Sequence, residues 1–255
     1  MFKSMHRAEG PLVICNVWDA ASATIAENIG FSALGTSSAA IAKSLGKEDG
    51  ENIQYEDLLF IVKAIVSSTN LPVTVDIESG FGDTPKAIAK NIIELVKVGV
   101  VGINIEDSVM VEGERCLCDG ALFADMLKQV RELLSDSCID VFINVRSDAF
   151  LLNVKEPLEV SLERISSYQQ AGADGIFLPC IRNVDDIEAV VASTSLPINV
   201  MCVPELPSFT ELKTIGVKRI SMGNFVYEAM LEALSSNLMS IQQDQSFQAL
   251  FLLDK

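Results

Sequence analysis

Carboxylate residues stand at the ends of consecutive apolar segments of the sequence. Asp76 and Glu78 lie at the end of one segment, Glu106 ends the next, and Asp148 follows the third. If these segments are neighbouring parallel strands, their ends lie about 4.8 Å apart, and the acids repel one another unless a cation lies among them. A single acid at a strand end is usually only a solvated loop start, but three adjacent ends weaken that interpretation. Mg²⁺, which keeps several waters, suits sparse carboxylates, and Mn²⁺ is an alternative. We therefore predict a magnesium site at Asp76, Glu78 and Glu106.

Arg146 follows the third of these segments directly. The chain has 19 Lys plus Arg against 35 Asp plus Glu, a formal net charge of −16. Such a field repels polyanions, which excludes nucleic acid as an expected partner, and it also opposes an anionic substrate. The site must then supply its own positive charge. Because a planar guanidinium fits a carboxylate, we predict that Arg146 binds the carboxylate of a small acid.

Eight short segments read as strands, and amphipathic segments such as 84–98 and 157–171 lie between them. This alternation is typical of a parallel α/β fold. The predicted strands are Leu12–Asn16, Ser32–Gly35, Pro72–Asp76, Gly102–Glu106, Asp140–Val145, Gly175–Leu178, Pro197–Met201 and Arg219–Met222. A doubly wound sheet is the alternative, but the glycine-rich nucleotide loop expected after its first strand is missing. We predict one (β/α)₈ barrel domain over residues 1–255, with 224–255 as a C-terminal helical segment.

Six motifs in order along the chain resemble the isocitrate lyase and phosphoenolpyruvate mutase superfamily. They are Asn16-Val17-Trp18-Asp19-Ala20-Ala21-Ser22-Ala23, Gly35-Thr36-Ser37-Ser38-Ala39, Ser44-Leu45-Gly46-Lys47-Glu48-Asp49-Gly50, Val75-Asp76-Ile77-Glu78-Ser79-Gly80-Phe81-Gly82, Gly102-Ile103-Asn104-Ile105-Glu106-Asp107-Ser108 and Asn144-Val145-Arg146-Ser147-Asp148-Ala149-Phe150. The resemblance covers nearly the whole chain. It implies an enzyme that cleaves or forms C–C or P–C bonds of a 2-oxo or 2-hydroxy acid through a metal-bound enolate.

The resemblance also assigns roles to residues of this chain. Asp76 resembles the direct Mg²⁺ ligand, and Asp49, Glu78 and Glu106 resemble ligands that bind through water, although the family usually has aspartate where Glu78 stands. Backbone amides at Ser37 and Ser38 resemble a cradle for the substrate carboxylate. The same comparison counts Trp18 and Asp49 with the substrate-binding residues. It counts Arg146 and Glu106 with the catalytic ones.

The segment 108–119 departs from the family pattern. It occupies the place of a mobile catalytic loop in which isocitrate and methylisocitrate lyases carry a Lys-Lys/Arg-Cys-Gly-His motif, and only Arg115-Cys116 remains of that motif. Cys116 as the catalytic acid is a minority hypothesis, because a loop cysteine without an activating base is more often inert. We expect this loop to close over the substrate. His6, the one histidine of the chain, is expected on the surface, and Pro179 stands where the phosphomutases have histidine.

The reaction ranked first is decarboxylation of an oxaloacetate-type acid, because loss of CO₂ requires no acid at the bond that breaks. A methylisocitrate- or isocitrate-type lyase comes second, and phosphonopyruvate or phosphoenolpyruvate chemistry third. A Schiff-base aldolase would need a lysine at a strand end, and no predicted strand ends in one. A non-catalytic oxo-acid-binding barrel would have little reason to keep the acids.

The apolar run Ala249–Leu253 needs a surface to cover it, either on its own barrel or on a neighbouring subunit. The resemblance implies that the last helix is exchanged between paired barrels, and two pairs would form a tetramer. The N-terminus has no apolar core of a signal peptide, and no stretch of 18 apolar residues occurs. Six scattered cysteines suggest reduced thiols. A cytoplasmic protein with no membrane contact is expected.

Overall fold

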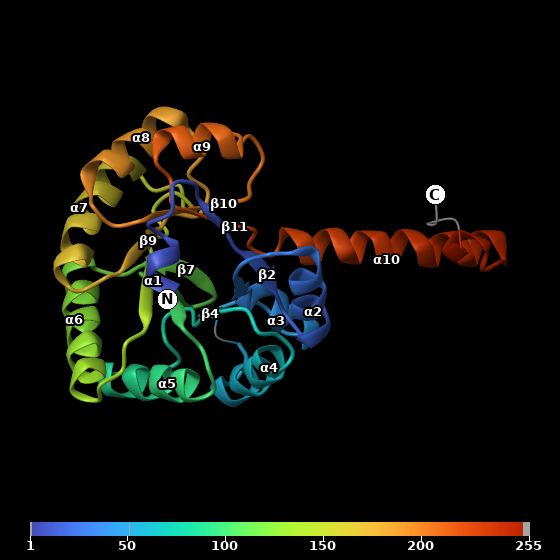
Figure 1. Ribbon diagram of the computed structural model, residues 1–255, viewed down its shortest axis with the longest axis horizontal. Helices are drawn as coiled ribbons and strands as arrows, with labels where there is room; N and C mark the ends of the chain where they lie inside the picture. Colours follow the sequence, from blue (N-terminus) through green and yellow to red (C-terminus); the bar gives the residue numbers. More distant parts are fainter. Residues whose placement is uncertain (1, 51, 252–255) are drawn as a thin grey trace.

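A parallel sheet curls into a barrel inside a ring of helices in the computed structural model, which describes residues 2–50 and 52–251 (Figure 1). The first strand is interrupted at Ile14, which divides it into β1 (Leu12–Val13) and β2 (Cys15–Val17). β1 pairs with β11 and β2 pairs with β3, so the two edges of the sheet meet along this one strand. The predicted TIM-barrel fold is therefore confirmed.

The other seven strands overlap the predicted segments in order. They are β3 (Leu34–Thr36), β4 (Val73–Asp76), β5 (Gly102–Glu106), β8 (Phe142–Arg146), β9 (Gly175–Phe177), β10 (Ile198–Met201) and β11 (Arg219–Ser221). All pairings among them are parallel, so their carboxyl ends lie at one end of the barrel. Glu106 pairs in register with Arg146 across β5 and β8. The register thus places an acidic and a positively charged residue side by side at that end.

Helices alternate with the strands and cover the outside of the barrel. They are α2 (Ala20–Ile29), α3 (Ser38–Ser44), α4 (Tyr55–Ser67), α5 (Pro85–Lys97), α6 (Gly120–Asp136), α7 (Pro157–Gln170), α8 (Val184–Ser193) and α9 (Phe209–Ile215). The hydroxyl of Thr84 caps α5, whose first residue is proline, a combination that suits a helix start. Gly30 and Gly216 end α2 and α9 in the left-handed conformation, which glycine adopts without steric cost.

The inside of the barrel carries an amide network beneath the strand ends. Asn144 Nδ2 donates to Asn104 Oδ1 (2.9 Å) and to Asn199 Oδ1 (3.1 Å). Arg219 is buried there, and its Nη2 donates to Thr74 Oγ1 (3.2 Å) and Asn104 Oδ1 (3.3 Å). The network lies under the end of the barrel where the acids gather. Its hydrogen bonding is incomplete, since Asn144 Oδ1 and the Nε and Nη1 of Arg219 have no hydrogen-bond partner among the described residues.

The short helix α1 (Phe2–Met5) covers the opposite end of the barrel, where the N-terminus lies over the centre of the ring (Figure 1). The expectation that His6 lies on the surface is wrong, because this residue is only 4% exposed. Its ring stacks on Phe142 with centroids 4.3 Å apart and meets the edge of Phe2. The aromatic contacts explain the burial, and His6 lies far from the catalytic end.

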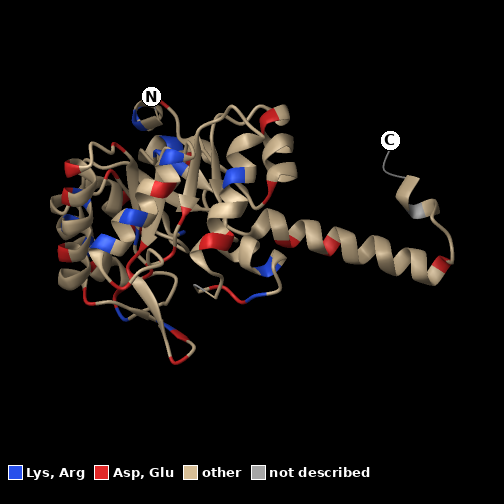
Figure 2. Ribbon diagram, turned by 90° about the horizontal axis from the view of Figure 1, so that it is seen from below, with Lys and Arg blue, Asp and Glu red and all other residues tan. Residues whose placement is uncertain are grey.

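Two parts of the chain project from the barrel, which are a hairpin and the C-terminal helix. The segment after β5 forms an antiparallel hairpin of β6 (Ser108–Val111) and β7 (Glu114–Leu117), at the end away from the N-terminus (Figure 2). The helix α10 (Phe225–Asp244) projects sideways from the barrel, and the short 3₁₀ helix η1 (Gln248–Phe251) follows it.

Of the two surfaces considered for the apolar tail, its own barrel does not cover the described part of it. Leu234, Leu238 and Phe251 are more than half exposed. Residues 252–253 of the predicted apolar run lie outside the described residues. No helix among the described residues has the length and apolarity needed to span a bilayer.

Candidate active site

A cavity of about 280 Å³ opens at the carboxyl ends of the strands, where the sequence predicts the chemistry. It is lined by Asn16, Ser37, Ser38, Ala39, Asp49, Asp76, Asn104, Arg115, Arg146, Leu151, Phe177, Pro179, Met201, Ser221, Gly223 and Asn224. Five predicted site residues, which are Ser37, Ser38, Asp49, Asp76 and Arg146, are among them. The structure therefore brings together residues that are up to 109 positions apart.

Asp76 lies at the end of β4 with its carboxylate buried. Ser38 Oγ donates to Asp76 Oδ2 at 2.8 Å, whereas Asp76 Oδ1 has no hydrogen-bond partner among the described residues. Burial raises the pKa of Asp76, although the charge of Arg146 and the bond from Ser38 oppose this. A buried oxygen without a donor is costly unless something binds it. Its chemistry fits a direct ligand to a hard cation.

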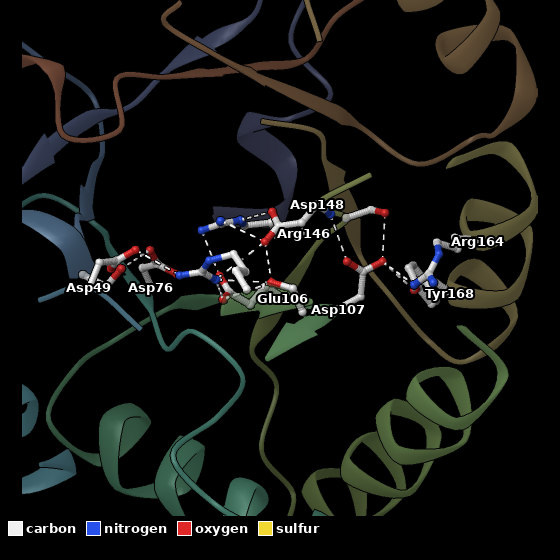
Figure 3. Close-up of polar contacts among 12 residues, drawn as sticks. Asp49, Asp76, Glu106, Asp107, Arg146, Asp148, Arg164 and Tyr168 are labelled. Carbon is white, nitrogen blue, oxygen red and sulfur yellow. Dashed lines mark hydrogen bonds and ion pairs between the residues drawn. The ribbon is translucent and has the colours of Figure 1, made fainter. Parts of the chain in front are cut away.

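Arg146, at the end of β8, is held by two carboxylates (Figure 3). Its Nε and Nη2 donate to the two oxygens of Asp148, at 2.6 and 3.0 Å, and its Nη1 lies 2.8 Å from Glu106 Oε2. Burial lowers the pKa of Arg146, but the charges of Glu106 and Asp148 outweigh it, and the net pKa is raised. The guanidinium is therefore permanently charged and fixed in orientation.

Glu106 is 3% exposed and lies between two arginines. Burial raises its pKa to about 7, and the neighbouring acids Asp148 and Asp76 add to the rise, while Arg146 and Arg115 oppose it. A perturbed carboxyl of this kind is typical of functional sites. Glu106 borders the neighbouring pockets and contacts the cavity through Arg146.

The β6–β7 hairpin carries Arg115 into the site. Arg115 forms ion pairs with Glu106 and with Asp49, the latter with Nη2 3.0 Å from Oδ2. It also lies among the residues that line the cavity. Ion pairs of Arg115 thus connect the predicted loop to the acids of the site.

Glu78 and Asp49 differ in their surroundings. Glu78 is buried, with φ +49°, a conformation that costs energy for a residue other than glycine and is common at functional sites. Asp49 is 42% exposed and pairs with Arg115. No group of three or more His, Cys, Asp or Glu side chains within the described part of the chain could hold a metal directly. The arrangement therefore fits one direct carboxylate with further acids acting through water better than an all-protein cage.

Ser37 and Ser38 start α3 beside Asp76. The amide of Ser37 donates to the carbonyl of Val17 at 3.1 Å, and its hydroxyl accepts from the amide of Ala40. The Ser37 amide is therefore already used and is not available for the predicted cradle. Ser38 keeps its place at the cavity, with its hydroxyl on Asp76.

The structure does not bring Trp18 or Cys116 to this cavity. Trp18 lines a separate apolar groove and packs edge-on against Tyr227, with ring centroids 5.0 Å apart. Cys116 is exposed, whereas Arg115 is only 14% exposed, because successive residues of a strand point to opposite faces. With Arg115 turned inward, Cys116 is directed away from the acids.

Sequence reasoning missed two features. The first is the hydrogen-bonded ion pair between Asp148 and Arg146. The two-residue spacing was an available signal for it, because residues i and i+2 of an extended chain point to the same side. The second is a group of apolar side chains in the cavity lining. Its members are Leu151, Phe177, Pro179 and Met201. Only the barrel geometry brings these four together, from the loop after β8, from β9 and the loop that follows it, and from β10.

A family model described as phosphoenolpyruvate phosphomutase matches residues 2–242. The chain belongs to this family. The match spans the barrel and nearly all of α10, so the phosphomutase-family assignment covers every residue of the candidate site.

Two relatives of this chain have different activities. The 2-methylisocitrate lyase of Halalkalibacterium halodurans is 29% identical over 77% of this chain and 65% of its own length. The oxaloacetate decarboxylase of Pseudomonas entomophila is 28% identical over 86% of this chain and 75% of its own. The relatives of this chain therefore include a 2-methylisocitrate lyase and an oxaloacetate decarboxylase.

The solved structure of 2,3-dimethylmalate lyase, a PEP mutase/isocitrate lyase superfamily member, superimposes with a TM-score of 0.83. The alignment covers 95% of this chain and 87% of that one, at 24% identity. This likeness shows the fold alone, and it leaves the reaction to the residues of the site.

Proposed function

We propose that this chain is a divalent-cation-dependent decarboxylase of a small 2-oxo-dicarboxylic acid of the oxaloacetate type. The observation that carries the proposal is the composition of the cavity, which combines charged groups with four large apolar side chains and Ala39 in about 280 Å³. A decarboxylase needs both: a charged region that holds the part of the substrate that stays, and an apolar region for the carboxylate that leaves.

Arg146 supports the first requirement. Two of the five N–H donors of Arg146 bond Asp148, and its Nη1 forms an ion pair with Glu106 Oε2. The remaining N–H groups can bind the carboxylate next to the 2-oxo group in a charge-assisted geometry. Because two acids fix the guanidinium, little side-chain entropy is lost when the substrate binds.

Phe177, Pro179 and Met201 support the second requirement. A carboxylate placed against apolar side chains loses its hydration, which destabilises the charged group, whereas CO₂ is neutral and pays no such cost. The apolar lining therefore favours the step in which the carboxylate becomes CO₂.

Asp76 supports the need for a cation. Its buried Oδ1 without a donor fits a direct ligand, with Asp49, Glu78 and Glu106 as candidates for contacts through water. When bound, Mg²⁺ or Mn²⁺ would draw charge from the 2-oxo group and stabilise the negative charge that develops on its oxygen. Ser38 orients Asp76 through its hydroxyl.

The test is a panel of oxaloacetate, methylisocitrate, isocitrate, 2,3-dimethylmalate and phosphonopyruvate, each incubated with and without Mg²⁺. The proposal expects pyruvate and CO₂ from oxaloacetate, in a reaction that EDTA stops. Cleavage of a hydroxy acid in place of oxaloacetate would establish lyase action, and turnover of phosphonopyruvate would establish P–C chemistry. Either result would overturn the proposal, as would binding of an oxo-acid without any turnover.

A further inference from the structure

Asp107 lies directly after the catalytic strand β5, yet it does not line the active-site cavity. Its carboxylate is fully buried and accepts four hydrogen bonds. The donors are Ser147 Oγ (2.8 Å), the Asp148 amide (2.9 Å), Arg164 Nη1 (2.8 Å) and Tyr168 OH (2.7 Å). Two of these donors come from the loop that follows Arg146, and two come from α7 (Figure 3).

We propose that Asp107 is a positioning residue, through which helix α7 fixes both the guanidinium of Arg146 and the base of the β6–β7 hairpin. The proposal rests on the proposed function in one respect: Arg146 is taken to bind the substrate carboxylate. The positioning role itself is carried by contacts that involve no ligand.

The first route leads to Arg146. Asp107 Oδ1 accepts from the amide of Asp148, and the side chain of Asp148 holds Arg146 through two bonds. Ser147, between these residues, donates to Asp107 Oδ2. The loop backbone is therefore tied at two consecutive residues. A shift of this backbone would move Asp148 and turn the guanidinium away from the cavity.

The second route leads to the hairpin. Arg164 Nη2 donates to the carbonyl of Cys118 at 2.7 Å, and the amide of Cys118 donates to the carbonyl of Asp107 at 2.8 Å. Cys118 follows β7 directly, so these bonds fix the point at which the hairpin returns to the barrel. Arg115, on β7, reaches the acids from this fixed base.

The charges support a positioning role over a direct chemical one. Arg164 neutralises Asp107, and the hydroxyl of Tyr168, on the same helix, accepts from Arg164 Nη1 and donates to Asp107 Oδ2. Burial raises the pKa of Tyr168, and the charge of Asp107 raises it further, so the hydroxyl stays protonated as a donor. The group is thus a satisfied buried network, which fixes geometry well.

The test uses a matched pair of arginine substitutions. Arg164→Gln removes the link from α7 to Asp107, whereas Arg131→Gln removes a comparable link at the other end of the barrel, where Arg131 bonds the carbonyls of Gly172 and Val141 and the carboxylate of Asp174. Both should lower the melting temperature. The readout is the affinity for oxalate in the presence of Mg²⁺, measured by calorimetry. Oxalate is a planar dicarboxylate, and it resembles the enolate that decarboxylation of oxaloacetate would leave.

We expect Arg164→Gln to weaken oxalate binding by about 10-fold or more, the usual effect of losing a partner that orients a ligand-binding group. Arg131→Gln should bind as the unaltered protein does, and Arg164→Lys should recover part of the affinity. Tyr168→Phe, a milder change, should show a smaller loss. Equal losses in Arg164→Gln and Arg131→Gln, or no loss in Arg164→Gln, would overturn the proposal.

Hydrogen–deuterium exchange keeps the positioning role separate from the proposed function. Without any ligand, Arg164→Gln should speed exchange in 108–118 and 146–150, and Arg131→Gln should not. If the unaltered protein binds no oxalate, the proposed function fails, and the exchange result then decides the positioning role alone. Unchanged exchange in both segments would contradict it.

Discussion

Arg146 and Asp148 form a two-bond ion pair at the carboxyl end of β8, with Nε–Oδ1 at 2.6 Å and Nη2–Oδ2 at 3.0 Å. The pair is buried, and Glu106 contacts the remaining end of the guanidinium. A buried charge held in this way keeps a fixed direction. Arg146 is therefore prepared for its ligand before the ligand arrives, which is the basis of the first prediction.

Arg146→Lys should raise KM and lower kcat together on the true substrate. Lysine keeps the charge but lacks the fork that bonds Asp148 and presents two donors at once. Loss of charge-assisted bonds should reduce kcat/KM on the order of 10- to 100-fold. Steady-state kinetics measures this, with Arg182→Lys, an exposed arginine paired with Glu205, as the control. Unchanged constants in Arg146→Lys would show a structural role only.

Cys116→Ser should retain most decarboxylase activity, because Cys116 is exposed and Arg115 occupies the inward face of the hairpin. An enzyme that used Cys116 as its acid would lose roughly 10²- to 10⁴-fold. Initial rates of the variant and the unaltered protein decide between these. A loss of that size, with the melting temperature unchanged, would favour the lyase alternative.

A homo-oligomer in which α10 crosses to a neighbouring barrel is our proposal for the tail. Leu234 and Leu238 lie four residues apart on one side of α10 and are 51% and 57% exposed. A groove lined by Trp18, Ile25 and Met230, among others, offers an apolar surface near the base of α10.

The double variant Leu234→Glu, Leu238→Glu should shift the mass in solution to a smaller species, and so should deletion of residues 241–255. Ser236→Glu, on the same helix, adds charge without removing an apolar side chain and serves as the control. Light scattering at micromolar concentration provides the measurement. A full-length protein that is already monomeric would rule out the exchange.

His6 should make stability depend on pH. Burial lowers its pKa from 6.5 to about 4, and the charge of Arg219 adds to this. The folded state therefore prefers the neutral ring. Its contribution is fully present above pH 6.5 and is lost as the pH falls from 6.5 towards 4, by up to about 3 kcal/mol.

The check is a comparison of urea unfolding at pH 7 and pH 4.5 for the unaltered protein and for His6→Phe, which keeps the ring stacked on Phe142. The variant should lose less stability on acidification. If both lose the same amount, titration of the carboxylates accounts for the whole effect.

The sequence predicts the barrel well, because each strand is a short apolar run bounded by helix ends such as Gly30 and Gly216. It also places Asp76, Glu106 and Arg146 correctly at one end, since parallel strands align their carboxyl ends. Side-chain direction is harder to predict. Cys116 faces outward because Arg115 faces inward, and that choice depends on hairpin register and on distant acids.

Contacts between distant segments were also beyond the sequence. His6 is buried because its ring contacts Phe2 and Phe142 at the end of the barrel opposite the active site. Phe142 lies 136 positions away from His6 in the sequence. The same holds for Asp107, whose partners Arg164 and Tyr168 lie on a helix more than 50 positions away. A single sequence shows which residue types are present, but it does not show which of them come into contact in the folded chain.

The most direct test of the proposed reaction is the rate of pyruvate formation from oxaloacetate with Mg²⁺, followed by a lactate dehydrogenase coupled assay. Mg²⁺ without protein gives the background, and Asp76→Ala, which removes the carboxylate with the unpaired buried oxygen, gives the control. We predict turnover well above background that EDTA abolishes and that falls to background in Asp76→Ala, while the variant stays folded. Pyruvate formation no faster than background with the unaltered protein, or full activity in Asp76→Ala, would contradict the account.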